Sequence, residues 1–242
     1  MFHDIYTLAQ RPKAVAGVDG ARGGWLVAVW DGNSCALDLV KHAETLFTLP
    51  VAFMTVDMPI GLPDRGARIC DLHARRGLPG KRKSCVFPAP RRYMLNLPDY
   101  ERAQQAGKTC EGKGLSKQAW NLIPKIAELD AAIIPAMQSR IRETHPELAF
   151  NARIPSEWGL SALASKKSSE GSVQRCAILR ATGLPEPKHW FDSFPRKQAT
   201  NDDILDTLIA TAVAYACLYK TASTTGKPRE YDATGLAMEI WW

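Results

Sequence analysis

Residues 53–63, FMTVDMPIGLP, contain a predicted strand that ends abruptly. Residues 53–56 have side chains typical of a buried strand, and Pro59 and Pro63 prevent its continuation. Asp57 therefore lies at the end of a strand that we expect to be buried. Burying a charged carboxylate without a partner costs several kcal/mol, so Asp57 requires a compensating group.

The residues before this strand predict an antiparallel meander. Residues 14–18 and 25–30 form apolar runs, residues 35–40 alternate apolar with polar side chains, and glycine-rich turns connect the three segments. Asp19 directly follows the first run. A second carboxylate is therefore expected at a strand end.

The residues after the strand change in character. Residues 64–140 are mostly helical or loop-forming, and we interpret them as a helical insertion that covers one face of the sheet. The following segment, RIRETHPELAF, returns to a strand-like pattern. Glu143, His145 and Glu147 share the same parity there, which would place them on one side of the strand. The proline between them favours an edge strand or an early end.

Residues 201–220 predict the last long element, a core helix that starts at the capping candidates Asn201 and Asp202. Asp206 lies inside the apolar stretch of this helix, so it needs a buried partner as Asp57 does. Asp203 precedes it on nearly the same helix face. The helix therefore adds carboxylates to the two at the strand ends.

A divalent metal ion is a natural partner for Asp19, Asp57 and Asp206. Hard cations bind oxygen ligands, and two Mg²⁺ ions roughly 3.5–4 Å apart commonly cleave phosphodiester bonds. Carboxylates on separate rigid elements supply such ligands without loop motion. The residues alone also allow a turn aspartate at Asp19, a cap of the turn after Asp57, and a salt bridge from Asp206 to Lys or Arg.

The composition is that of an ordinary globular protein with a basic balance. The 242 residues are 45% hydrophobic and 23% charged. A formal net charge of +6 and a pI near 9.0 favour an anionic partner. Lys and Arg concentrate between Arg75 and Arg92, where a solvated basic loop is the alternative interpretation.

The cysteines and the hydropathy indicate the expected compartment. The six cysteines are scattered without C-x-x-C spacing, which favours reduced thiols over a zinc site or a disulfide framework. The sequence has no run of about eighteen apolar residues, and its N-terminus lacks the regions of a signal peptide. We therefore expect a cytoplasmic protein without a membrane partner.

The chain contains, in this order, the segments GVDGARGGW, VDMPIGLPDRGARICD, CVFPAPRR, LSKQAW, ETHPELAF, SKKSSEG and DDILDTL. Together they resemble a widespread uncharacterised family of predicted nucleases with a ribonuclease-H-like fold (domain of unknown function 429). The resemblance covers nearly the whole chain, from about Val15 to the closing GLAMEIWW. It implies one α/β domain over residues 1–242. The implied core is a five-stranded mixed sheet with an N-terminal antiparallel meander, flanked by helices, with the helical insertion of residues 64–140 after the fourth strand.

The family pattern has acidic residues on the first strand, the fourth strand and the final helix, where this chain has Asp19, Asp57 and Asp206. The resemblance implies a metal-dependent nuclease that hydrolyses DNA or RNA by a two-metal carboxylate mechanism with Mg²⁺ or Mn²⁺. The expected catalytic residues are Asp19, Asp57, Glu143 and Asp206, with Glu147 as the alternative to Glu143. The expected metal ligands are Asp19, Asp57, Asp203 and Asp206.

The resemblance also marks candidates for binding the phosphates of the substrate. A solvated charged surface is the alternative for the basic candidates, and a structural histidine is the alternative for His145. The expected substrate-binding residues are Arg68, Arg91, Arg92, Lys117, Gln118, His145, Lys166 and Lys167. Trp241 and Trp242 are compatible with base stacking, although packing of the C-terminus onto the core is the preferred interpretation.

Two other functions stay open. The same fold superfamily includes nucleotide-dependent phosphotransferases and ATPases, but the only phosphate-loop-like turn, GVDGARGG, does not match a P-loop. A non-catalytic nucleic-acid-binding protein is the second alternative. The oligomeric state is not decided by the sequence; a homodimer is compatible with it, because junction-cleaving proteins with this core commonly pair.

Overall fold

The computed structural model describes residues 4–225 and 228–242, which form two compact units. The first unit contains the described residues up to Met58 together with Arg140–Ser223 and Trp241–Trp242. The second contains Pro59–Ser139 and the described residues of Thr224–Ile240. The first segment of the second unit nearly coincides with the expected insertion of residues 64–140, but the unit also includes a C-terminal segment that the sequence pattern does not predict there.

A six-stranded mixed sheet with the strand order β3-β2-β1-β4-β5-β8 forms the centre of the fold. Neighbours from β3 to β1 pair antiparallel, and β1, β4 and β5 pair parallel. The strands are β1 (Val15–Ala21), β2 (Gly24–Trp30), β3 (Cys35–Val40), β4 (Phe53–Asp57), β5 (Ile141–Thr144) and β8 (Ile240–Trp241). The α/β class and the antiparallel meander are confirmed. The expected number of five strands is wrong, because the two-residue strand β8 is too short to show an alternating pattern.

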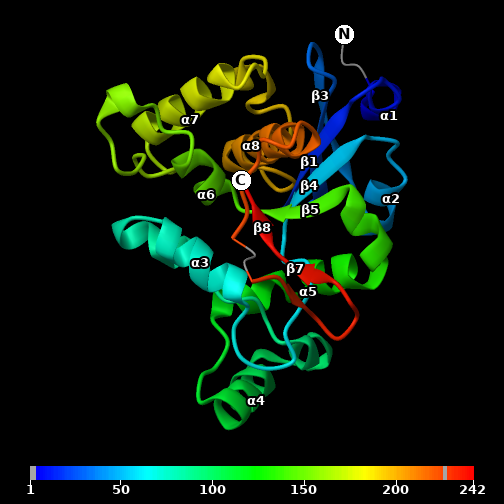
Figure 1. Cartoon of the computed structure of the whole chain (residues 1–242), viewed down its shortest axis with the longest axis vertical. Helices are drawn as coiled ribbons and strands as arrows, with labels where there is room; N and C mark the ends of the chain where they lie inside the picture. The colour runs from blue at the N-terminus through cyan, green and yellow to red at the C-terminus, as the bar shows by residue number, and fades with distance from the viewer. Residues whose placement is uncertain (1–3, 226–227) are drawn as a thin grey trace. The chain divides into compact units, whose positions relative to one another are not determined.

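The helix α8 (Asn201–Leu218) packs on β1 and β4 and starts at a capping box formed by Thr200 and Asp203. Figure 1 shows α8 lying against these strands. The hydroxyl of Thr55 on β4 donates a hydrogen bond to the Ala210 carbonyl at 2.6 Å. The helix is apolar around most of its circumference, and accordingly residues 204–214 are all buried.

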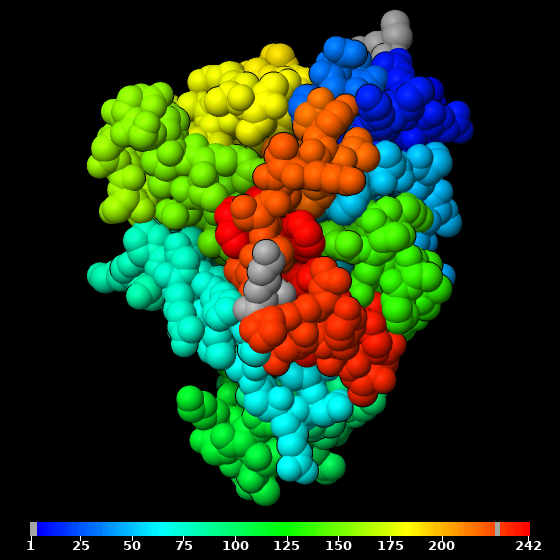
Figure 2. Space-filling view, in the orientation of Figure 1, coloured from blue at the N-terminus to red at the C-terminus, as the bar shows by residue number. Residues whose placement is uncertain are grey.

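The remaining helices of the first unit are short, apart from α7 (Ser169–Ala181). Both α6 (Pro146–Asn151) and α7 contact α8. The loop between α6 and α7, coloured yellow-green, and α7, coloured yellow, lie side by side on the surface in Figure 2. The other elements of this unit are α1 (Ile5–Ala9), α2 (Ala43–Phe47), η4 (Ser156–Trp158) and η5 (Pro187–Trp190).

The second unit is mainly helical and has a small apolar core of its own, formed by Met94, Ala103, Leu115, Ala119 and Ile123. Its helices are α3 (Ile69–Gly77), α4 (Tyr100–Glu111) and α5 (Lys117–Ala132), with the short 3₁₀ turns η1 (Gly80–Cys85), η2 (Arg92–Asn96) and η3 (Pro135–Ser139). The antiparallel pair β6 (Glu230–Tyr231) and β7 (Ala237–Met238) completes it.

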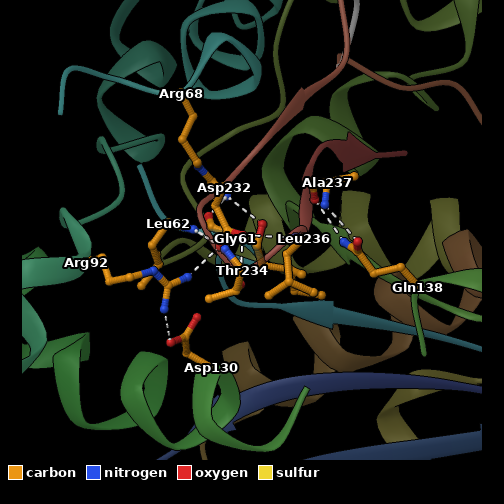
Figure 3. A network of polar contacts seen from close by, with 11 residues as sticks. Gly61, Leu62, Arg68, Arg92, Asp130, Gln138, Asp232, Thr234, Leu236 and Ala237 are labelled. Atoms are coloured by element: carbon orange, nitrogen blue, oxygen red, sulfur yellow. Dashed lines mark hydrogen bonds and ion pairs between the residues drawn. The ribbon is translucent and has the colours of Figure 1, made fainter. Parts of the chain in front are cut away.

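A network of polar contacts joins the two segments of the second unit, as Figure 3 shows. Arg92 donates to the carboxylates of Asp130 and Asp232, each at 2.5 Å. Asp232 also accepts the backbone N–H groups of Leu62 and Leu236. Gln138 exchanges two hydrogen bonds with the backbone of Ala237, both at 2.8 Å. These contacts pair partly buried polar groups and so hold residues 232–237 against the helical segment.

None of the helices within residues 4–225 and 228–242 is both long and apolar enough to cross a bilayer.

Candidate metal centre

Two of the three expected carboxylates come from neighbouring parallel strands. Asp19 on β1 pairs in register with Asp57, the last residue of β4. Paired residues of parallel strands project to the same face of a sheet, so both carboxylates lie on one face. Gly17 and Thr55 share this parity, and both contact α8, which identifies the face as the one that α8 covers.

The third carboxylate, Asp206, comes from α8 itself. One carboxylate oxygen each from Asp19, Asp57 and Asp206 lies within 4.8 Å of the others, so the three form a single cluster. Asp19 and Asp206 are 8% and 7% exposed, and Asp57 is partly buried. Three carboxylates brought together by two strands and a helix offer oxygen ligands on rigid elements, which suits a hard divalent cation.

Burial and mutual repulsion make these carboxylates hard to ionise. Burial raises the pKa of Asp19 well above its usual value, and the charges of Asp206 and Asp203 raise it further. Burial also raises the pKa of Asp57, with further contributions from Asp19 and Asp206. The pKa of Asp206 rises to about 6, because the effect of burial exceeds the stabilisation of its charge by Lys166. A bound cation would relieve this repulsion.

Lys166 is the direct ionic partner of the cluster. Its ammonium group donates to Oδ2 of Asp206 at 3.0 Å. Although burial disfavours the ammonium, the charge of Asp206 holds the pKa of Lys166 above its usual value. The salt bridge considered as an alternative for Asp206 is therefore present, and it places Lys166 beside the carboxylate cluster and not on a separate charged surface.

Glu143 lies outside the cluster. Its partner in the β4–β5 register is Val56, the neighbour of Asp57, so the pleat directs Glu143 to the opposite face of the sheet. Glu143 is 5% exposed, and its charge makes a small contribution to the raised pKa of Asp57. The strand β5 ends at Thr144, which confirms the early end indicated by Pro146. We do not include Glu143 among the proposed ligands.

Glu147 and Arg175 form a second ion pair close to the cluster. Arg175 on α7 is 1% exposed and donates to Oε1 of Glu147 on α6 at 2.6 Å. The charges of both residues act on the pKa of Asp206. The sequence patterns above do not single out Arg175, although an arginine followed by CAIL inside a helical pattern is a signal that it needs a buried partner.

Asp203 takes part in the capping of α8. Its Oδ2 accepts the backbone N–H of Thr200 at 2.7 Å, and the Thr200 hydroxyl accepts the N–H of Asp203. Asp203 acts on the cluster through its charge, since it helps to raise the pKa of Asp19. Its carboxylate is not part of the group within 4.8 Å, so its contribution to a metal site stays a prediction.

The three arginines expected to bind substrate are ion-paired within the second unit. Arg68 is 2% exposed and binds Asp71 at 2.5 Å. Arg91 binds Glu111 at 3.0 Å, and Arg92 binds the two aspartates of the network in Figure 3. Arg68 and Arg91 are buried and Arg92 is partly buried, and each already holds a carboxylate, so their contact with substrate stays a prediction.

The other expected substrate-binding residues lie in different environments. The ammonium of Lys117 lies 4.2 Å from the ring centre of Tyr100, and Gln118 is exposed on α5. His145 is partly buried at the N-cap position of α6, and Lys167 is exposed beside Lys166. Among these candidates, Lys166 contacts the cluster directly. Trp241 and Trp242 pack against the core of the first unit, which confirms the packing interpretation.

The raised pKa values predict how pH changes the stability of the metal-free protein. The pKa of Asp206 is about 6 in the folded state against the usual 3.8, so the folded state binds this proton more tightly than the unfolded state. The stabilisation is present below pH 3.8 and is lost as pH rises through about 6. In the presence of a chelator, wild type should therefore lose roughly 2 kcal/mol of stability relative to Asp206→Asn between pH 4 and pH 7. Urea unfolding at a series of pH values measures this difference, and parallel curves for the two proteins would contradict it.

Comparison with known proteins identifies the family. Residues 17–230 match the family model described as a protein of unknown function (DUF429). No curated protein matches the chain, and no solved structure matches it either. The match covers most of the chain and includes Asp19, Asp57 and Asp206. The chain therefore belongs to the DUF429 family.

Proposed function

We propose that this protein is a metal-dependent nuclease that hydrolyses phosphodiester bonds in DNA or RNA. The observation that carries the proposal is the cluster of Asp19, Asp57 and Asp206, with one oxygen of each within 4.8 Å of the others. Such carboxylate clusters are the usual support for the divalent ions that cleave phosphodiesters.

The residues present suit Mg²⁺ or Mn²⁺. The donor set is all oxygen, and its members are wholly or partly buried. Burial raises the pKa of each carboxyl group, and repulsion within the cluster raises the pKa of Asp19 and Asp57 further. Asp19, Asp57 and Asp206 would hold the ion, which would supply an activated water and stabilise the leaving oxyanion. The chain itself keeps the carboxylates in place, because two come from paired strands and one from the helix packed on those strands.

The order of the elements supports a ribonuclease-H-like core. The sheet begins with an antiparallel meander, and β4 and β5 then add parallel to β1. The acidic residues fall on the first strand, the fourth strand and the final long helix, as the family resemblance implies. The short strand β8 extends the expected five strands at the edge beside β5.

The distribution of positive charge supports a nucleic acid as the partner. The net charge is +6, and Arg76, Lys81 and Lys83 are exposed on α3 and η1 of the second unit. Exposed cations attract a phosphate backbone over a long range, whereas arginines held in ion pairs contribute little to binding. We therefore assign phosphate contact to these exposed residues in place of Arg68, Arg91 and Arg92.

A cleavage assay tests the proposal. Single-stranded, duplex and branched DNA and RNA are incubated with wild type in Mn²⁺ or in chelator, and the assay is repeated with Asp19→Asn and Asp57→Asn. We expect metal-dependent cleavage that falls on the order of a hundredfold or more in both variants. Asp38→Asn is the control, because Asp38 is exposed on β3 of the same sheet and the substitution changes the charge equally.

Three results would contradict the proposal. The first is cleavage that persists in chelator or in both variants, because it would not depend on the cluster. The second is hydrolysis of nucleotides without cleavage of any nucleic acid, which would indicate a phosphotransferase or ATPase. The third is nucleic-acid affinity that neither chelator nor Asp19→Asn changes, in the absence of cleavage, which would indicate a binding protein.

A further inference from the structure

The ammonium group of Lys166 is a positive charge that lies directly beside the carboxylate cluster. Its ammonium group lies 3.0 Å from Oδ2 of Asp206. The two side chains differ in burial, since that of Lys166 is 41% exposed and that of Asp206 is 10% exposed. The lysine side chain is therefore more exposed than the carboxylate that its ammonium group binds.

The main chain that carries Lys166 is fixed by the start of α7. The Ser168 hydroxyl donates to the Ser165 carbonyl at 2.7 Å and accepts the N–H of Gly171 at 3.1 Å. A Cβ atom at Gly171 would lie 2.0 Å from the Ser165 carbonyl oxygen, so only glycine permits this approach. Close backbone contacts thus hold the segment SKKSSEG, from which the Lys166 side chain extends to Asp206.

Arg175 ties the same loop to α6. Its guanidinium donates to the carbonyl oxygens of Ala164 and Gly171, at 3.2 and 3.1 Å, and to the carboxylate of Glu147. Its 1% exposure shows that these contacts are shielded from water. The backbone on both sides of Lys166 is therefore held, so the lysine would leave Asp206 through rotations of its four-carbon stem.

A lysine head and a divalent metal compete for the same carboxylate. An ammonium group has no free electron pair, so it cannot coordinate a metal, and two cations that share Asp206 repel each other. The charge of Lys166 compensates part of the charge of three clustered carboxylates when no metal is bound. We propose that Lys166 is an internal counter-ion that stabilises the metal-free cluster and leaves Asp206 when a divalent metal binds. This inference rests on the proposed function, because it concerns the same cluster.

Replacing Lys166 by methionine tests the counter-ion role through two readouts that move in opposite directions. In chelator, Lys166→Met should have a lower Tm than wild type, because the carboxylates lose their compensating charge. At pH 8, where protons compete weakly for carboxylates, its Kd for Mn²⁺ should be at least roughly tenfold lower than that of wild type. A purely structural lysine would lower the Tm without tightening Mn²⁺ binding.

Two matched variants control for charge. Lys167→Met removes the same charge from the adjacent exposed position and should leave both the Tm and the Kd for Mn²⁺ close to those of wild type. Lys166→Arg keeps the charge and should also bind Mn²⁺ with nearly the wild-type Kd. If Lys166→Met binds Mn²⁺ no more tightly than Lys167→Met, the counter-ion role is rejected while the metal site stands. If neither wild type nor Lys166→Met binds Mn²⁺, the inference fails together with the proposed function.

A measurement on wild type covers the case in which Lys166→Met does not fold. The ¹⁵N signal of the Lys166 ammonium group is followed by NMR during titration with Mg²⁺. We expect the signal to shift and its protons to exchange faster with water as the contact with Asp206 is lost. A signal that stays unchanged at saturating Mg²⁺ would show that the ion pair persists, which would overturn the inference.

Discussion

Gly17→Ala should destabilise the first unit by more than about 4 kcal/mol or prevent it from folding. A Cβ atom at Gly17 would lie 2.1 Å from the backbone nitrogen of Thr211 and 2.5 Å from the carbonyl oxygen of Thr207. Overpacking of a core commonly costs about 1–3 kcal/mol when side chains can move aside, but here the obstacle is the backbone of α8. The helix would have to move away from β1, which would separate Asp206 from Asp19.

Urea unfolding of Gly17→Ala measures this cost, with Gly32→Ala as the control. Gly32 lies in the turn between β2 and β3 with a φ of +99°, and a Cβ atom added there would meet nothing within 4 Å. Alanine there should cost only the backbone strain of roughly 1–3 kcal/mol. A free energy of unfolding for Gly17→Ala within about 1 kcal/mol of wild type would contradict the close packing of α8 on β1.

The first four strands and the last helix could be predicted from the sequence. Apolar runs and glycine-rich turns identify β1, β2 and β4 because these strands are almost continuously buried. The apolar stretch of α8, with a carboxylate inside it, likewise indicates a buried helix whose carboxylate binds a buried partner. The positions of Asp19, Asp57 and Asp206 follow from these elements.

The elements that the sequence does not predict depend on contacts between distant residues. The strand β8 has two residues, and the second unit includes residues 224–240, which are far in sequence from its helices. No local pattern marks such pairings, because their stability comes from partners such as Arg92 with Asp232. Local periodicity therefore locates the helical insertion, but it does not show that residues 224–240 belong to the same unit.

The charged residues show a similar limit. By sequence, Arg68 and Lys166 are both candidates for phosphate contact, yet one is buried against Asp71 and the other is bound to Asp206. The type of residue does not reveal whether a cation faces solvent or a carboxylate across the fold. Asp203 is a different case. The N-cap of α8 is Thr200 and not the expected Asn201 or Asp202, although the pattern Thr-x-x-Asp before an apolar run is close to a capping box.

Loss of Mn²⁺ binding in Asp57→Asn and Asp206→Asn is the other large effect that we expect. Each variant removes the negative charge of one carboxylate, and replaces one of its two oxygens by an NH₂ group, in a cluster that has one oxygen from each of three residues within 4.8 Å. Two remaining carboxylates coordinate a hard cation poorly, so the affinity should fall on the order of a hundredfold or more. Both variants should stay folded, because neutral amides relieve the repulsion that raises the pKa values of the cluster.

Isothermal titration calorimetry of Mn²⁺, without nucleic acid or nucleotide, tests the central claim most directly. Wild type, Asp57→Asn and Asp206→Asn are compared, with Asp38→Asn as the exposed control and circular dichroism to verify folding. We expect wild type and Asp38→Asn to bind Mn²⁺ and both cluster variants to lose that binding. Wild type that fails to bind at millimolar Mn²⁺, or a folded cluster variant that binds as tightly as wild type, would contradict the account.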